Sequence, residues 1–174
     1  MSEPQYVKPV RLIISMMYDL GNRGTALELL SVLEDRYGTC EAASPEYDFD
    51  FTNFYQHEFG RSLKKTYFCF CMIKPDALPI IKRYCFELEQ RYSSGKKRLV
   101  NIDVGYLSET SLVLATFKPR PHRIYLRAGV YADLELVYEK KEWKSFSWTF
   151  PDLKTDIIKE FLNKIKNYFL QQPK

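Results

Sequence analysis

The sequence has few of the residues that mark metal-binding, secreted or membrane-spanning proteins. Its 174 residues include four cysteines and two histidines, His57 and His122, and the cysteines form neither a C-x-x-C pair nor a metal-ligand pattern with them. The longest apolar run, at positions 12–17, is far shorter than the roughly 20 residues of a membrane helix. The N-terminus lacks the pattern of a signal peptide. These absences predict a cytoplasmic protein with free thiols and no membrane contact.

Hydrophobic residues make up 45% of the chain and aromatic residues 16%, which predicts one well-buried core and a single domain over 1–174. The net charge of +4 is unevenly spread, because residues 61–98 hold ten Lys or Arg against three Asp or Glu. This basic segment forms either a patch that attracts phosphate or a solvated surface of basic turns.

The hydrophobic periodicity predicts an α+β fold. Strands are expected at 10–17, 47–51, 66–73 and 98–103, with helices at 25–37 and 79–92. The order strand, helix, strand, strand, helix, strand is that of a ferredoxin-like βαββαβ unit. Further antiparallel strands are expected at 111–117, 122–126 and 130–138. A C-terminal helix then follows, with Asp152 as its N-cap and Trp148 as its anchor.

Five segments carry a family resemblance. They are Phe51-Thr-x-Phe-Tyr-x-x-Glu58-x-Gly60, Arg98-x-x-Asn-Ile-Asp-x-Gly-Tyr-Leu107, His122-Arg-Ile-Tyr-Leu126, Gly129-Val-Tyr-Ala132 and Trp148-Thr-Phe-Pro-Asp152. Through them the chain resembles a bacterial family known as domain of unknown function 4416, over nearly its whole length. Members of that family are sometimes labelled GTP-binding proteins. The chain has no G-x-x-x-x-G-K-[ST] segment, so we expect no P-loop nucleotide site.

The candidate site lies between Arg98 and Tyr125, where polar residues interrupt strand-like sequence. Side chains alternate along a strand, so Asn101 and Asp103 are expected on one face and Arg98 on the other. Asn101 and Asp103 can coordinate a divalent cation, or Asp103 can act as a catalytic base. The alternative is an Asx-type turn that closes the strand.

His122 and Arg123 are expected on opposite faces of the predicted strand at 122–126. His122 is a candidate catalytic proton donor and acceptor, and Arg123 is a candidate anion clamp. Alternatively, His122 is a hydrogen-bonded structural residue and Arg123 pairs with Asp133 or Glu135. The remaining candidate ligand contacts are Tyr106 and Tyr125.

Three classes of function follow. The first, which we rank narrowly ahead, is a binder of a small phosphorylated or nucleotide-like anion, or an enzyme acting on one. In this class Arg98, Arg123 and His122 contact the anion, and Asp103 positions a proton or a divalent cation. The second is RNA binding through a basic, aromatic-rich sheet, because residues 65–72 resemble a strand of RNA-recognition motifs without its glycine. The third is a non-catalytic scaffold or interaction module, which an exposed apolar stripe would favour.

Overall fold

The computed structural model describes residues 3–95 and 97–171, with side chains up to residue 167. The helices are α1 Arg23–Tyr37, α2 Gln56–Phe59, α3 Leu78–Arg91 and α4 Asp156–Gln171, with short 3-10 turns at Leu20–Asn22, Pro75–Ala77 and Pro151–Lys154. The strands are β1 Val10–Asp19, β2 Ala42–Ala43, β3 Tyr47–Asp48, β4 Leu63–Ile73, β5 Ser93–Ser94, β6 Lys97–Arg98, β7 Val100–Leu107, β8 Ser111–Thr116, β9 Ile124–Arg127, β10 Val130–Glu139 and β11 Glu142–Ser145. The fold is therefore a mixture of helix and strand, as the periodicity predicts.

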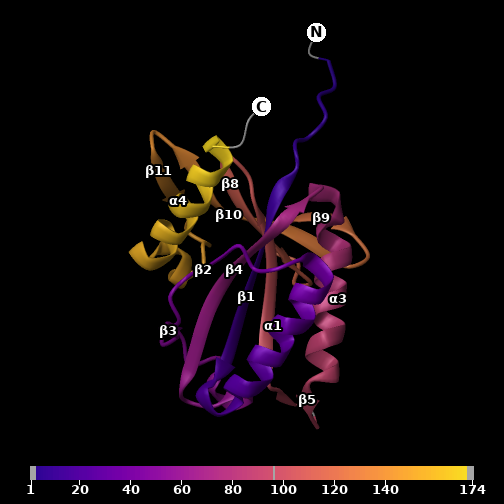
Figure 1. The fold of residues 1–174 in the computed structure, drawn as a ribbon, viewed down its shortest axis with the longest axis vertical. Coiled ribbons are helices and arrows are strands. Elements are labelled where there is room, and N and C mark those ends of the chain that lie inside the picture. Colours follow the sequence, from indigo (N-terminus) through magenta and orange to yellow (C-terminus); the bar gives the residue numbers. More distant parts are fainter. Residues whose placement is uncertain (1–2, 96, 172–174) are drawn as a thin grey trace.

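The main sheet is open and antiparallel (Figure 1). Its strands follow the order β11-β10-β8-β7-β1-β4-β2, while β3 also pairs with β4 and β9 with β10. The long central strand β1 lies between β4 and β7, and β4 lies between β1 and the short strands β2 and β3. A separate hairpin, β5-β6, precedes β7.

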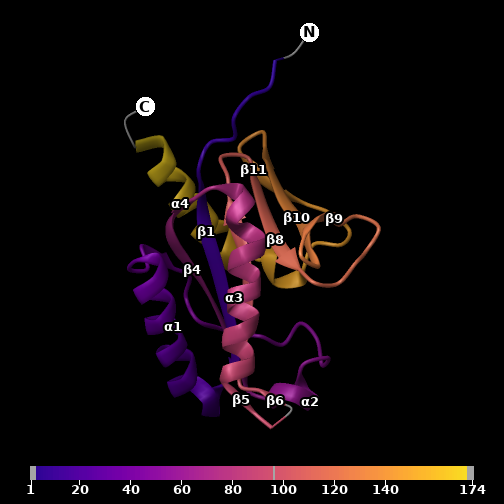
Figure 2. The ribbon, with the colours of Figure 1, turned by 90° about the vertical axis from the view of Figure 1, so that its right-hand side faces the viewer.

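Helices cover both faces of the sheet. Helices α1 and α3 lie side by side (Figure 2), and their apolar residues pack on Leu12, Ile14 and Met16 of β1. Helix α4 packs on the opposite face, in a second cluster that includes Ile13. The alternation of β1 side chains between these clusters explains why this strand reads as one continuous apolar run. No helix in the described ranges is long and apolar enough to cross a membrane.

The sheet opens along one edge of β7. Strand β8 pairs with β7 only from Val104 onward, so within the described part of the chain the first half of β7 has no strand partner on that side. Two side chains of α3 take the place of that strand. Glu89 Oε1 accepts a hydrogen bond from the Ile102 N–H at 2.6 Å, and Lys82 Nζ donates one to the Ile102 carbonyl at 2.9 Å. These contacts satisfy backbone groups that would otherwise be buried and unpaired.

Several predicted details are wrong. The expected strand at 47–51 is reduced to β3, Tyr47–Asp48. Asp152 does not cap α4, because it lies in the 3-10 turn before the helix and its carboxylate is buried against other side chains. Trp148 is not the anchor of α4, since its indole N–H donates to the Leu134 carbonyl. Trp143 has that role, because its indole N–H donates to Asn163 of α4.

Candidate functional site

A cleft of about 420 Å³ lies where β8 diverges from the first half of β7. Helix α3 contributes Lys82, Phe86 and Glu89 to its lining, and the segment before α2 contributes Phe54 and Tyr55. The predicted residues Arg98, Asn101, Asp103 and Arg123 line the same cleft. Four of the seven predicted site residues are thus brought together by the fold.

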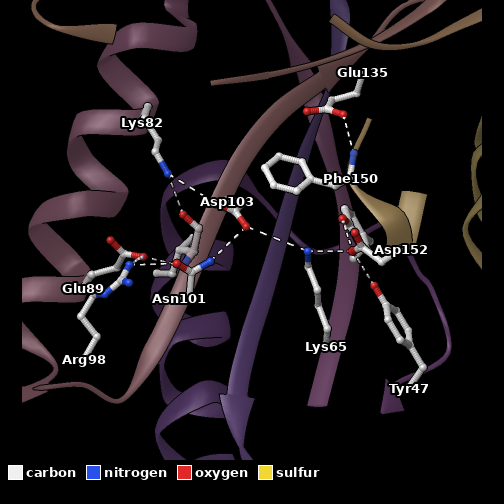
Figure 3. A network of polar contacts seen from close by, with 12 residues as sticks. Tyr47, Lys65, Lys82, Glu89, Arg98, Asn101, Asp103, Glu135, Phe150 and Asp152 are labelled. Atoms are coloured by element: carbon white, nitrogen blue, oxygen red, sulfur yellow. Dashed lines mark hydrogen bonds and ion pairs between the residues drawn. The ribbon is translucent and has the colours of Figure 1, made fainter. Parts of the chain in front are cut away.

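A hydrogen-bonded chain runs from Arg98 to Asp103 (Figure 3). Arg98 Nη1 donates to Asn101 Oδ1 at 2.8 Å, and Asn101 Nδ2 donates to Asp103 Oδ2 at 3.0 Å. The expectation that Arg98 faces away from this pair is wrong, because the chain breaks its strand geometry at Leu99, between β6 and β7. The alternative of an Asx-type turn is also wrong, since both Asn101 and Asp103 lie within β7.

Arg98 is held by two acidic side chains. Its guanidinium makes a two-pronged contact with Glu58 of α2, at 2.7 and 2.9 Å, and lies 3.3 Å from Glu89. These hydrogen bonds raise the pKa of Arg98 and lower that of Glu58. Burial raises the pKa of the Glu89 carboxyl, although Lys82 and the Ile102 amide oppose that shift. Arg98 is therefore a fixed cation in the wall of the cleft.

Asp103 lies between two ammonium groups. Its carboxylate oxygens are 4.0 Å from Lys65 Nζ and 3.9 Å from Lys82 Nζ, and its side chain is 36% exposed. Asp103 is thus the accessible carboxylate at the centre of the network in Figure 3. The two flanking cations oppose direct coordination of a divalent cation by Asp103. Among the described residues no group of three or more His, Cys, Asp or Glu side chains is arranged to hold a metal ion.

Lys65 connects Asp103 to a buried carboxylate. Its Nζ donates to Asp152 Oδ2 at 2.8 Å, and the same oxygen accepts hydrogen bonds from the hydroxyls of Tyr47 and Tyr67. Burial opposes ionisation of Asp152, but Lys65 and the two hydroxyls outweigh it and lower the carboxyl pKa. Burial and the charge of Asp152 raise the pKa of both tyrosines. Asp152 is therefore ionised and fully paired on this oxygen.

His122 and Arg123 both reach Asp133. Arg123 Nε donates to Asp133 Oδ2 at 2.7 Å, and His122 Nε2 lies 3.5 Å from Oδ1. The expectation of opposite faces is wrong, because both residues lie in a turn before β9 rather than in a strand. The alternative pairing of Arg123 with Asp133 is confirmed. The His122 ring stacks on Trp148 with centroids 4.7 Å apart, and it does not line the cleft.

A buried carboxyl, Glu135, lies beside this cluster at an irregularity in the pairing of β10 with β8. Burial, and then the neighbouring charge of Asp133, raise the pKa of Glu135 to about 8. Its Oε2 accepts a hydrogen bond from the Phe150 N–H at 3.1 Å. Phe150 in turn lines the cleft, so the buried carboxyl supports a residue of its wall.

A second hollow of about 340 Å³ adjoins the cleft on the side of Lys65. Five aromatic rings line it: Phe49, Phe51, Phe54, Tyr55 and Phe150. Asn101, Asp103 and Lys118 line both hollows, which makes them a shared boundary.

Lys118 and Arg120 supply the accessible positive charge of the cleft. Both line it from the turn after β8, and both are exposed. Neither has an ion-pair partner within the residues that the structure describes. Lys118 Nζ instead lies 5.5 Å from the centre of the Phe54 ring. These two cations, unlike Arg98 and Arg123, are available to an anion.

Two predicted contacts lie elsewhere. Tyr106 packs against the cluster under α1 and α3, on the face opposite Asp103. Tyr125 is 58% exposed on β9 and packs edge-on against Tyr131. The strand compared with RNA-recognition motifs is β4, where Tyr67, Phe68 and Phe70 are buried, so its aromatic rings are covered.

Sequence reasoning missed the lysines and the acids that complete the network. Lys65 lies beside Lys64 and Thr66 in the polar first part of β4, and Lys82 and Glu89 look like polar positions of an amphipathic helix. Two signals were available. Lys65 and Lys82 belong to the basic segment 61–98, and Lys82 and Glu89 are seven residues, or about two helical turns, apart and so share one face of α3.

Comparison with known proteins identifies the family. The searches of curated proteins and of solved structures found no match. A family model described as a domain of unknown function, DUF4416, matches residues 8–169. These residues include the whole cleft and every strand, and the chain therefore belongs to the DUF4416 family.

Proposed function

We propose that the protein binds a small phosphorylated or nucleotide-like anion in the cleft beside β7. One observation carries this proposal: Lys118 and Arg120 line a cleft of about 420 Å³ without carboxylate partners in the described ranges. Ligand pockets typically combine this volume with apolar walls and a few placed polar groups. Phe54, Phe86 and Phe117 supply apolar wall here, and the Arg98-Asn101-Asp103 chain supplies fixed polar groups.

Thermal denaturation with inorganic phosphate, sugar phosphates and nucleotides tests the proposal. A ligand present at a hundred times its dissociation constant stabilises a protein by about 2.7 kcal/mol, which gives a clear rise in melting temperature. We expect the double variant Lys118→Ala/Arg120→Ala to lose that rise. Lys140→Ala/Lys141→Ala is the matched control, since it removes the same charge from an exposed turn between β10 and β11. Equal responses of the two double variants would contradict the proposal.

We also infer that residues 10–107 form a ferredoxin-like unit. The support is the strand order β7-β1-β4-β2. Helix α1 connects β1 to β2 across β4, and helix α3 connects β4 to β7 across β1, as in a ferredoxin-like unit. The unit then ends at the open edge of β7, where the cleft lies.

A second candidate function, protein interaction, is favoured by β9. Ile124, Tyr125 and Leu126 expose 71%, 58% and 39% of their surface on a strand that, among the described residues, pairs only with β10. Exposed edge strands can pair with a strand of another chain. Under this alternative a second copy pairs with β9, and light scattering gives twice the 20.6 kDa mass of the chain. A mass that stays at one copy at high concentration counts against it.

A further inference from the structure

We infer that the anion is a ribonucleotide whose base lies in the aromatic hollow, whose phosphate lies at Lys118 and Arg120, and whose sugar hydroxyls contact Asp103. This inference rests on the proposed function and specifies its ligand. The cleft and the hollow share their boundary residues Asn101, Asp103 and Lys118, so one ligand can extend across both. Each part has a volume within the range of small-molecule sites.

The aromatic hollow is suited to a planar ring. Phe51 and Phe54 are exposed at 37% and 70%, although most large apolar side chains of this protein are buried. Exposed rings around a hollow leave their faces accessible, and every nucleobase has a flat face that can stack on them. The one lysine of the hollow other than Lys118 is Lys65, which Asp152 already neutralises. The hollow therefore favours an uncharged ring over a second anionic group.

The position of the charges orients the ligand. The Asp103 carboxylate repels a phosphate that contacts it directly. The two flanking ammonium groups are already bound, Lys65 by Asp152 and Lys82 by the Ile102 carbonyl, and both are buried. Lys118 and Arg120 attract the phosphate to the cleft side of that boundary. The group between ring and phosphate then lies against Asp103, and in a nucleotide that group is the sugar.

Asp103 has the chemistry to bind sugar hydroxyls. Its Oδ2 accepts the Asn101 amide at 3.0 Å, whereas Lys82 Nζ, the cation nearest to Oδ1, is 3.9 Å away and beyond hydrogen-bond distance. Oδ1 is thus available to accept a hydroxyl. An acidic side chain that accepts from ribose hydroxyls is a common way to recognise this sugar.

Isothermal titration of the full chain with four probes tests the inference: ribose 5-phosphate, a nucleoside, the matching nucleoside 5′-monophosphate, and its 2′-deoxy form. We expect the monophosphate to bind about tenfold more tightly than ribose 5-phosphate, and the deoxy form to bind more weakly than the ribo form. Equal binding of ribose 5-phosphate and the monophosphate overturns the inference but leaves the proposed function standing. Failure of every phosphorylated probe to bind overturns both.

Two variants assign the roles of the residues. Phe51→Ala should weaken the monophosphate about tenfold and leave ribose 5-phosphate unchanged, because Phe51 lines the hollow but not the cleft. Tyr6→Ala, which removes a fully exposed ring, should change neither. Asp103→Ala should bring the ratio of ribo to deoxy affinity close to one, and this ratio is independent of the charge change. A Phe51→Ala protein that loses affinity for both phosphates equally, or an unchanged ratio in Asp103→Ala, contradicts the assignment.

Discussion

Lys65 and Asp152 form an ion pair 2.8 Å long between β4 and the turn before α4, with both side chains almost fully buried. The pair joins the central sheet to the segment that leads into the C-terminal helix. The hydroxyls of Tyr47 and Tyr67 also donate to Asp152 Oδ2, so this oxygen has exchanged water for three donors. Such a pair contributes little when intact, but removal of one partner leaves a buried charge without compensation.

We therefore expect Asp152→Asn to destabilise the protein by about 3–5 kcal/mol, measured by urea denaturation. The amide keeps the size of the side chain but leaves the buried Lys65 ammonium with only the more distant Asp103 carboxylate, 4.0 Å away, as a counter-charge. The control is Asp48→Asn, which breaks the more exposed pair with Lys64. That substitution should cost about 1 kcal/mol or less, because water solvates the released charge. Similar losses in both variants would contradict the burial argument.

Glu135 makes stability depend on pH between about 5 and 8. In the folded protein its carboxyl keeps its proton up to a pKa of about 8, whereas in the unfolded chain it loses the proton at about 4.3. Between these values the folded state binds more protons, so the stability that Glu135 contributes is present at low pH and falls as the pH rises. Above about pH 8 its contribution no longer changes.

The variant Glu135→Gln removes this dependence and retains an oxygen for the Phe150 N–H. We expect the stability of Glu135→Gln relative to wild type to rise with pH by up to about 1.4 kcal/mol per unit across this window. Denaturation in urea at pH 5, 6, 7, 8 and 9 measures the difference. Glu139→Gln, an exposed substitution on the same strand, is the control. Its free energy of unfolding should change with pH in the same way as that of the wild type. If the free energy of unfolding of Glu135→Gln also changes with pH as that of the wild type does, Glu135 does not keep its proton in the folded protein across this pH range.

The sequence predicts best where one local pattern decides the outcome. The strands at β1 and β4 and the helices α1 and α3 follow from hydrophobic periodicity, and each of them is present close to its predicted bounds. Asn101 and Asp103 also share a face, as strand alternation requires. Convergence of Arg123 on the same cleft could not be predicted, because it depends on which strands become neighbours.

The failures have a common physical cause, which is a local departure from regular strand geometry. The break at Leu99 turns Arg98 toward Asn101, and the turn before β9 lets His122 and Arg123 reach one carboxylate. Leu99 and its direct neighbours include no glycine or proline, so the sequence carries no signal for the first break. Pro119 and Pro121 come just before His122, so the second break had a turn signal, which the predicted strand at 122–126 did not take into account. The lysines of the network were missed because their partners are distant in sequence.

The backbone of β7 at Ile102 should open more often when the Glu89 side chain of α3, its hydrogen-bond partner, is removed. Glu89→Ala deletes the acceptor of the Ile102 N–H and leaves that amide buried, at a cost of about 1–3 kcal/mol. We expect faster hydrogen exchange at the Ile102 amide than at the amides of β1. Glu87→Ala, on the exposed side of the same helix, is the control and should leave the exchange of Ile102 unchanged. Unchanged protection in Glu89→Ala would mean that the side chain does not substitute for a strand.

Gly105 is required for the close pairing of β7 with β8. A Cβ at this position would lie 2.4 Å from the Val113 carbonyl oxygen and 2.5 Å from a methyl carbon of Leu114, distances at which the backbone must move. Gly105→Ala should therefore destabilise the protein by about 1–3 kcal/mol, as overpacking does. Gly24→Ala provides the contrast, because no atom lies within 4 Å of its Cβ position and alanine favours helix α1. In thermal denaturation Gly105→Ala should melt well below wild type, while Gly24→Ala should melt at the same temperature or higher. A Gly105→Ala protein as stable as Gly24→Ala would contradict the predicted clash.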